Sequence, residues 1–346
     1  MPSAARDHGA RTHRRHRING NGAGTEGLVV ANVGAVLERG GETVRPPSRL
    51  AIPAALLSVT IWGSYYPIIE YLLASWDAVT LSWARNVMAA MALGVLLVMT
   101  EGARSLIRDV PWRPVWLIGV VGVAANILLS SYAVQFAGAV PAALITGGTP
   151  VLAALMAWFF YGQRPRWLAW FAIVLALAGV TIVTLGGSGW DGSFMGGEFM
   201  VLAAALTWVW YMIMIQKALP GFSQLRATTI TMITGAFAST GGYGAVLVLG
   251  YGPVAYDTGA SSLGLVFFSA AGSVALGTVL WNFAVSRLGV TVTSLFGNLV
   301  PVVAVALSLA WGGTIGGLQV VGGVLVLIAV IIMQVGPRLA ARTRRG

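Results

Sequence analysis

One arginine lies inside a long apolar stretch of the chain, where a positive charge is costly. Arg85 follows Asp77 by eight residues, which corresponds to about 12 Å of helical rise. An ionisable side chain at that depth in a bilayer is a functional candidate by default. Arg85 is interpreted either as the counter-ion of an anionic or zwitterionic substrate or as a structural residue. In the structural alternative it binds backbone carbonyls or the carboxylates of Glu70, Asp77 or Glu198.

Aromatic residues recur away from the ends of the apolar stretches, and polar residues accompany them. A pocket with aromatic walls and a few polar groups suits a small amphipathic ligand. Asparagine and serine also join membrane helices to each other, and aromatic rings also form ordinary packing or lipid-facing surface, so both interpretations stay open. With Arg85, the residues expected to bind substrate are Trp62, Tyr65, Tyr66, Asn126, Thr146, Trp208, Tyr211, Trp281, Asn282 and Asn298.

Two prolines, Pro150 and Pro301, lie at matching positions in the middle of two apolar stretches. Proline removes a backbone donor and clashes with the preceding turn, which frees carbonyl groups where a helix kinks. The pair is interpreted as two hinges, or alternatively as two fixed kinks that shape the packing.

The composition places these residues in a membrane protein. The chain has 346 residues, of which 57% are hydrophobic and 9% charged, whereas a soluble domain carries roughly a quarter charged residues. The net charge of +10 does not indicate nucleic acid, because the basic residues are spread over loops and tails. The lipid bilayer is the expected partner.

Ten apolar stretches are long enough to cross a bilayer, which requires about 20 residues each. We expect spans at roughly 51–71, 77–99, 114–134, 139–161, 166–186, 196–216, 226–249, 261–285, 290–311 and 316–336. Lysine and arginine occur in every second loop, which is the positive-inside pattern and places both termini in the cytoplasm. With this orientation, 20 of the 21 basic residues are cytoplasmic and only Arg85 is not.

The two halves of the chain resemble each other. Aligning Pro150 with Pro301 also matches Gly138 with Gly289, and a shorter match pairs Trp62 with Trp208. Because five helices per half is an odd number, the second half inserts in the opposite orientation, and such repeats place a substrate site between the halves. The expected fold is an all-α integral membrane protein of ten helices in two inverted repeats. The expected organisation is a disordered basic tail (1–49), a first repeat (50–186), a second repeat (196–336) and a basic tail (337–346).

The chemistry of the chain argues against an enzyme. Cysteine is absent, and all three histidines, His8, His13 and His16, lie in the N-terminal tail. The apolar region therefore lacks the side chains of thiol nucleophiles and of most metal sites. We expect no metal and no cofactor.

The motifs resemble those of the drug/metabolite transporter superfamily, in particular its ten-helix EamA-type members, over about residues 50–337. The first span contains Ile61-Trp62-Gly63-Ser64, and the segments from Ala142 to Gly162 and from Thr293 to Gly313 repeat one family pattern. Arg85 is similar to an arginine that is common in the second helix of the family. The chain departs from the family at Gln163 and Thr314, where the family commonly has glutamate, so no role of that glutamate is carried over.

The resemblance implies a secondary transporter, an exporter of small organic metabolites or amino acids, that works by alternating access in the cytoplasmic membrane. A lipid-handling membrane protein or enzyme is the alternative, although clustered ionisable residues at a membrane face are not seen. A channel fits less well, because no repeated polar ring is visible. A homodimer is compatible with the sequence.

Overall fold

The computed structural model describes residues 49–162, 165, 167–187, 196–250 and 254–342. Most of the expected N-terminal tail (1–48) and the end of the C-terminal tail (343–346) lie outside the described residues. So do Gln163, Arg164, Arg166 and the loop with Asp191.

Every element in the described ranges is a helix. The first half contains α2 (Ala51–Leu72), α3 (Ala78–Glu101), η1 (Ala103–Leu106), α4 (Trp112–Leu117), η2 (Ile118–Ala125), α5 (Asn126–Ala137), α6 (Ala139–Thr146), α7 (Thr149–Tyr161) and α8 (Trp167–Gly187). The second half contains α9 (Gly197–Ala218), α10 (Gln224–Leu249), α11 (Ala260–Phe267), η3 (Phe268–Leu276), α12 (Gly277–Leu288), α13 (Val290–Gly297), α14 (Val300–Ala310) and α15 (Gly317–Arg342). Here η1 is a 3₁₀-helix, whereas η2 and η3 are π-helical segments inside longer helices.

Eight helices of the described chain are long and apolar enough to cross a membrane. A ninth candidate is the pair α6 and α7, which is bent by 47° at the break between Thr146 and Thr149. A shorter apolar helix covers Leu295–Ala310. The chain is therefore an all-α protein with many membrane-spanning helices.

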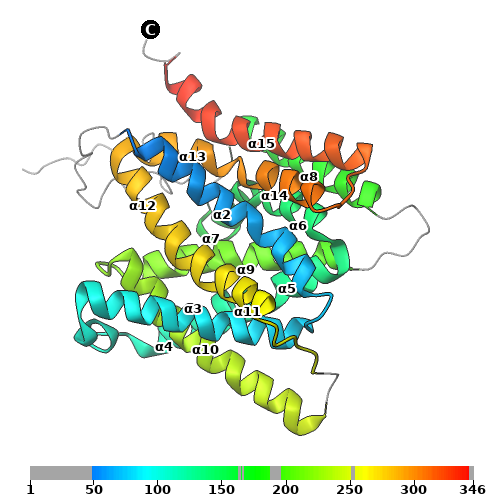
Figure 1. The fold of residues 1–346 in the computed structure, drawn as a ribbon. Coiled ribbons are helices and arrows are strands. Elements are labelled where there is room, and N and C mark those ends of the chain that lie inside the picture. Colours follow the sequence, from blue (N-terminus) through cyan, green and yellow to red (C-terminus); the bar gives the residue numbers. More distant parts are fainter. Residues whose placement is uncertain (1–48, 163–164, 166, 188–195, 251–253, 343–346) are drawn as a thin grey trace, which may run out of the picture.

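The helices form a bundle with one antiparallel pair along each of two opposite edges. Figure 1 shows α8 and α15 along one edge and α3 and α10 along the other. Between them, α2 packs against α12 and α14, and α9 packs against α5 and α7. Helices α2, α9 and α12, which carry most of the expected aromatic site residues, therefore lie between the two edge pairs.

A set of four consecutive elements recurs in the second half. The series η2, α5, α6 and α7 is followed about 150 residues later by η3, α12, α13 and α14 in the same order. In both series a glycine with positive φ, Gly138 (85°) and Gly289 (77°), separates the second element from the third.

Helix α3 begins after Asp77 and α10 after Ser223, and both side chains accept a hydrogen bond from a backbone N–H of the first turn.

The expected midspan kinks are complete breaks that lie just before the two prolines. Pro150 and Pro301 lie in the first turn of α7 and α14, where a missing N–H is tolerated. The two breaks meet, because a methyl group added to Gly147 would lie 2.8 Å from Cγ of Pro301. Their action as hinges stays a prediction.

Glycine allows a close helix approach between α8 and α15. A Cβ atom on Gly322 would lie 2.5 Å from the carbonyl oxygen of Gly179, and one on Gly179 would lie 2.7 Å from that of Gly322. Small residues of this kind let the backbones of membrane helices come into contact.

Candidate functional site

Helix α2 is fixed to the π-helical part of its neighbour by two side chains one turn apart. The indole N–H of Trp62 donates to the carbonyl oxygen of Ser273 at 2.9 Å, and the hydroxyl of Ser58 donates to that of Gly277 at 2.8 Å. The ring of Trp62 fits there only because residue 277 is glycine, since an added Cβ would lie 2.5 Å from Nε1 of Trp62. The orientation of this tryptophan is therefore determined by its neighbours.

Two aromatic pairs lie on consecutive turns of α2, beginning at Trp62. Trp62 lies against Trp281 of α12, with ring centroids 5.1 Å apart. On the next turn of α2, Tyr65 and Tyr66 meet edge to face, also at 5.1 Å. The side chain of Tyr66 lies near that of Thr146, the last residue of α6.

Arg85 of α3 joins this group through Tyr65. Its Nη1 donates to the hydroxyl of Tyr65 at 3.4 Å, and its Cζ lies 4.6 Å from the centroid of that ring, which is the geometry of a cation–π contact. The side chain is only 5% exposed, and its Nε is buried without a hydrogen-bond partner. The guanidinium group therefore retains unused donor capacity in a place where charge is poorly solvated.

The acids that could have neutralised Arg85 bind elsewhere. Glu70 accepts a hydrogen bond from the backbone N–H of Ala139 at 3.0 Å. Asp77 caps its own helix and accepts from the backbone N–H of Ala255 at 3.0 Å. Neither acid forms an ion pair with Arg85, so two of the partners considered in the structural alternative bind other groups.

Ion pairs are rare in the part of the chain that the structure describes. Within it, the one pair closer than 4.0 Å joins Arg108 to Asp109, and both side chains are about 80% exposed. Glu198 lies in the first turn of α9, as expected for an acid at a helix N-terminus, with Oε2 buried and unpaired. Arg85 is thus a buried cation without a carboxylate among these residues.

Six of the expected substrate-binding residues form two contact groups, Trp62 with Trp281 and Tyr65 with Tyr66, Arg85 and Thr146. The two groups lie on consecutive turns of α2, and together we call them the Arg85 site. The six residues come from α2, α3, α6 and α12. A fixed guanidinium group beside aromatic walls can bind a carboxylate in a bidentate manner. The Arg85 site has the chemistry to bind a small molecule that combines an anionic and an apolar part.

The expected asparagines lie elsewhere. Asn126 donates to the carbonyl oxygen of Ala204 and to the hydroxyl of Thr207, both on α9. Asn298 exchanges two hydrogen bonds of 3.1 Å with Gln334 of α15. Both amides join helices, and Asn282 is exposed on α12, so their part in substrate binding stays a prediction.

Trp208 and Tyr211 form a second group that mirrors part of the first. Their rings stack at 5.3 Å, and the hydroxyl of Tyr211 lies 3.4 Å from that of Thr231. Thr231 follows Tyr211 by 20 residues, as Arg85 follows Tyr65. The second half therefore has a neutral threonine where the first half has its buried arginine.

Ser273, Gly277 and Gln334 were not anticipated as parts of these contacts. Ser273 and Gly277 act through backbone atoms and through a missing side chain, which a search for functional side chains does not detect. Gln334 could have been found as a polar residue inside an apolar stretch.

Gly277→Ala should displace the indole of Trp62. Overpacking of this kind costs about 1–3 kcal/mol, so we expect a lower thermal unfolding midpoint of the purified protein. Gly264→Ala on α11 is the control, since an added Cβ meets no atom within 4 Å there and alanine favours the helix. Equal unfolding temperatures of the two variants would contradict the packing described for Trp62.

Metal ligands do not gather in the described ranges, where no group of three or more His, Cys, Asp or Glu side chains could hold an ion.

A family model gives the first comparison with known proteins. The model described as the EamA-like transporter family matches the chain twice, over residues 49–185 and 195–335. The two matches together cover nearly all of the described chain.

Individual proteins give the second comparison. The chain is 28% identical over 292 residues to a probable terminal-alkyne amino-acid exporter of Streptantibioticus cattleyicolor, with 82% of this chain and 93% of the relative covered. It is 27% identical over 288 residues to the uncharacterized transporter YyaM of Bacillus subtilis, with the same coverage. A protein of known crystal structure superposes with a TM-score of 0.56 at 20% identity, over 84% of this chain and 98% of that one. The last likeness concerns the fold alone.

Proposed function

Since the chain belongs to the EamA-like transporter family, we propose that it is a secondary transporter that exports small organic metabolites or amino acids by alternating access. Membership makes it a multi-pass membrane transporter and not an enzyme. The substrate class, the direction and the cytoplasmic membrane as its location are the proposed parts.

The observation that carries the proposal is the buried Arg85, which has no acidic partner among the residues that the structure describes. A buried charge is normally paired, and an intramembrane arginine marks a substrate or ion pathway. A substrate carboxylate would supply the missing charge, while Trp62, Trp281 and Tyr65 would contact its apolar part. One relative that is named as an amino-acid exporter agrees with this chemistry.

We further propose ten spans arranged as two inverted repeats, with both termini in the cytoplasm. The recurrence of four elements about 150 residues apart and the two matches of one family model support it. In this arrangement α13 and α14 together form the ninth span, as α6 and α7 form the fourth. The Arg85 site then lies between the repeats, where inverted-repeat transporters bind substrate.

A flux assay in proteoliposomes tests the proposed function. Vesicles with the purified protein should release preloaded amino acids or small carboxylates that carry an apolar group, and empty vesicles should not. The amide of the same compound is the matched control, because it lacks the charge that Arg85 would bind. Equal flux of acid and amide would contradict the role of Arg85, and no flux of any compound would contradict the transporter.

Labelling of single introduced cysteines tests the ten spans. Because the chain has no cysteine of its own, only the introduced residue can react. Thr314 lies in the exposed segment between α14 and α15. If α13 and α14 cross the membrane, Thr314→Cys in intact cells should react with an impermeant maleimide as fully as Thr258→Cys does. Gln224→Cys should react only after the cells are opened. Protection of Thr314→Cys in intact cells would show that α13 and α14 return to the inner face.

A further inference from the structure

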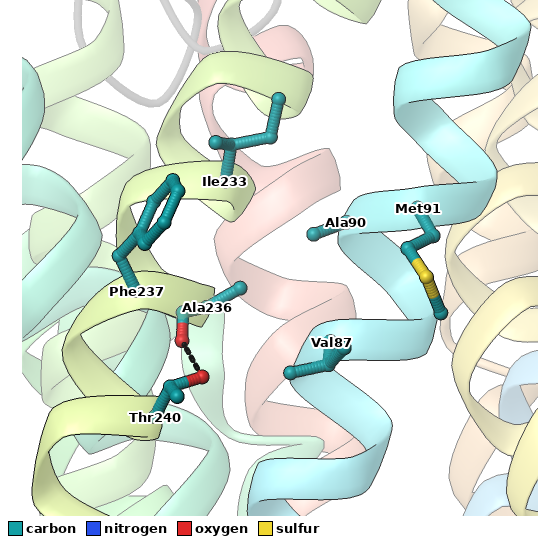
Figure 2. Close-up of a pocket in the computed structure, with 7 residues that line it drawn as sticks. All are labelled: Val87, Ala90, Met91, Ile233, Ala236, Phe237 and Thr240. Carbon is teal, nitrogen blue, oxygen red and sulfur yellow. Dashed lines mark hydrogen bonds between the residues drawn. The ribbon is translucent and has the colours of Figure 1, made fainter.

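A shallow groove of about 260 Å³ runs between α3 and α10 on the outside of the bundle (Figure 2). The methyl groups of Ala90 and Ala236 face each other across it. Met91 and Phe237 form its rim and are 59% and 64% exposed. The groove is smaller than the roughly 300–1,000 Å³ of pockets that hold drug-sized ligands, and Thr240 is the one polar residue of its lining.

The groove is closed towards the end of the bundle that contains Asp77. The indole N–H of Trp83 on α3 donates to the hydroxyl of Thr240 on α10 at 3.1 Å. The same ring stacks on Tyr243, with centroids 4.6 Å apart and planes 10° from parallel. A chain cannot enter the groove from this end without displacing that contact.

Towards the other end, α3 presents exposed apolar side chains. Val95 is 61% exposed and Met99 is 79% exposed, and they follow Met91 at intervals of four residues on the same face. Ten residues separate Met91 from Glu101, the last residue of α3, which is about 15 Å of helix. That is half of the roughly 30 Å hydrocarbon core, the depth that one acyl chain of one leaflet reaches.

Arginines follow the end of the row formed by Met91, Val95 and Met99 on α3, which we call the groove track. Arg226 of α10 donates from Nε to the carbonyl oxygen of Ser105 at 2.6 Å and from Nη2 to that of Arg108. These bonds hold the η1 segment, in which Arg104 is exposed, against the start of α10. The proposed orientation places these arginines at the cytoplasmic surface.

We infer that this face binds an anionic phospholipid of the inner leaflet, a site distinct from the Arg85 site. The phosphate would lie at Arg104 and Arg108, and one acyl chain would follow Val95 and Met91 into the groove. The closed end at Trp83 excludes the same binding from the outer leaflet. The inference depends on the proposed orientation of the chain and not on its substrate.

Native mass spectrometry of the purified full-length protein, freed of lipid and titrated with dioleoylphosphatidylglycerol or dioleoylphosphatidylcholine, tests it. We expect at least fivefold tighter binding of the anionic lipid. Ala236→Phe, which fills the groove, should weaken that binding at least fivefold. Ala245→Phe, on the exposed part of α10 beyond Tyr243, should leave it unchanged.

A matched pair of charge variants tests the headgroup. Arg104→Gln should weaken binding of the anionic lipid several-fold, whereas Arg49→Gln, which removes an exposed charge before α2, should not. Equal affinity for the two lipids, equal binding by the two phenylalanine variants, or equal effects of the two glutamine variants would overturn the inference. Because each readout is lipid binding, it is independent of whether any substrate is transported.

Discussion

Arg85→Gln should abolish transport and leave the protein folded, with a thermal stability equal to or higher than that of the natural chain. Removing one partner of a buried, hydrogen-bonded charge pair costs about 2–5 kcal/mol of binding, which corresponds to roughly 30-fold or more in affinity. Stability should not fall, because the arginine has no acidic partner within the described chain and burying an unpaired charge is unfavourable.

The assay is flux of a confirmed substrate in proteoliposomes, measured together with the unfolding temperature. Arg85→Lys retains the charge but not the planar fork of donors, so partial activity is expected. Arg49→Gln, which removes one exposed charge, should be as active as the natural chain. A loss of folding in Arg85→Gln would instead assign the residue a structural role, and full activity would remove it from the site.

Gly322→Ala should produce a large loss of stability for a change of one methyl group. Its Cβ would lie 2.5 Å from the carbonyl oxygen of Gly179, and backbone atoms cannot rotate away as a side chain can. Separating α8 from α15 would disturb the contact along one whole edge of the bundle. A cost of about 3 kcal/mol would lower the unfolding midpoint by roughly 5–10 °C.

Gly317→Ala on the same helix is the control, because nothing lies within 4 Å of its added Cβ. The double variant Gly179→Ala/Gly322→Ala should lose less than the sum of the two single losses, since one separation of the helices accommodates both methyl groups. An unchanged midpoint in Gly322→Ala, measured by thermal unfolding in detergent, would contradict the close helix contact.

The positions of the long helices could be predicted from the sequence. Hydrophobic length and flanking polar residues set them, and α3 begins one residue after Asp77, which caps it. The deep position of Arg85 could be predicted for the same reason, because a span fixes the depth of each of its residues. Its isolation from Glu70 and Asp77 could not, because that depends on which partners those acids find in three dimensions.

The interruptions of the helices were less predictable. The π-helical segments η2 and η3 are as apolar as their surroundings, so hydropathy gives no sign of them. Pro150 and Pro301 indicated the correct turns of the two interrupted helices, but the helices end before each proline and restart one residue before it. In the same way, the sequence could propose Asn298 as a polar residue in the membrane but could not show that its amide faces Gln334.

The contact between Gly147 and Pro301 has a mechanical consequence. The two interrupted helices, α6 with α7 and α13 with α14, touch each other where each is interrupted. The ring of Pro301 fills the space that the missing side chain of Gly147 leaves. A bulky residue at position 147 would therefore push the two interruptions apart, and so displace both interrupted helices together.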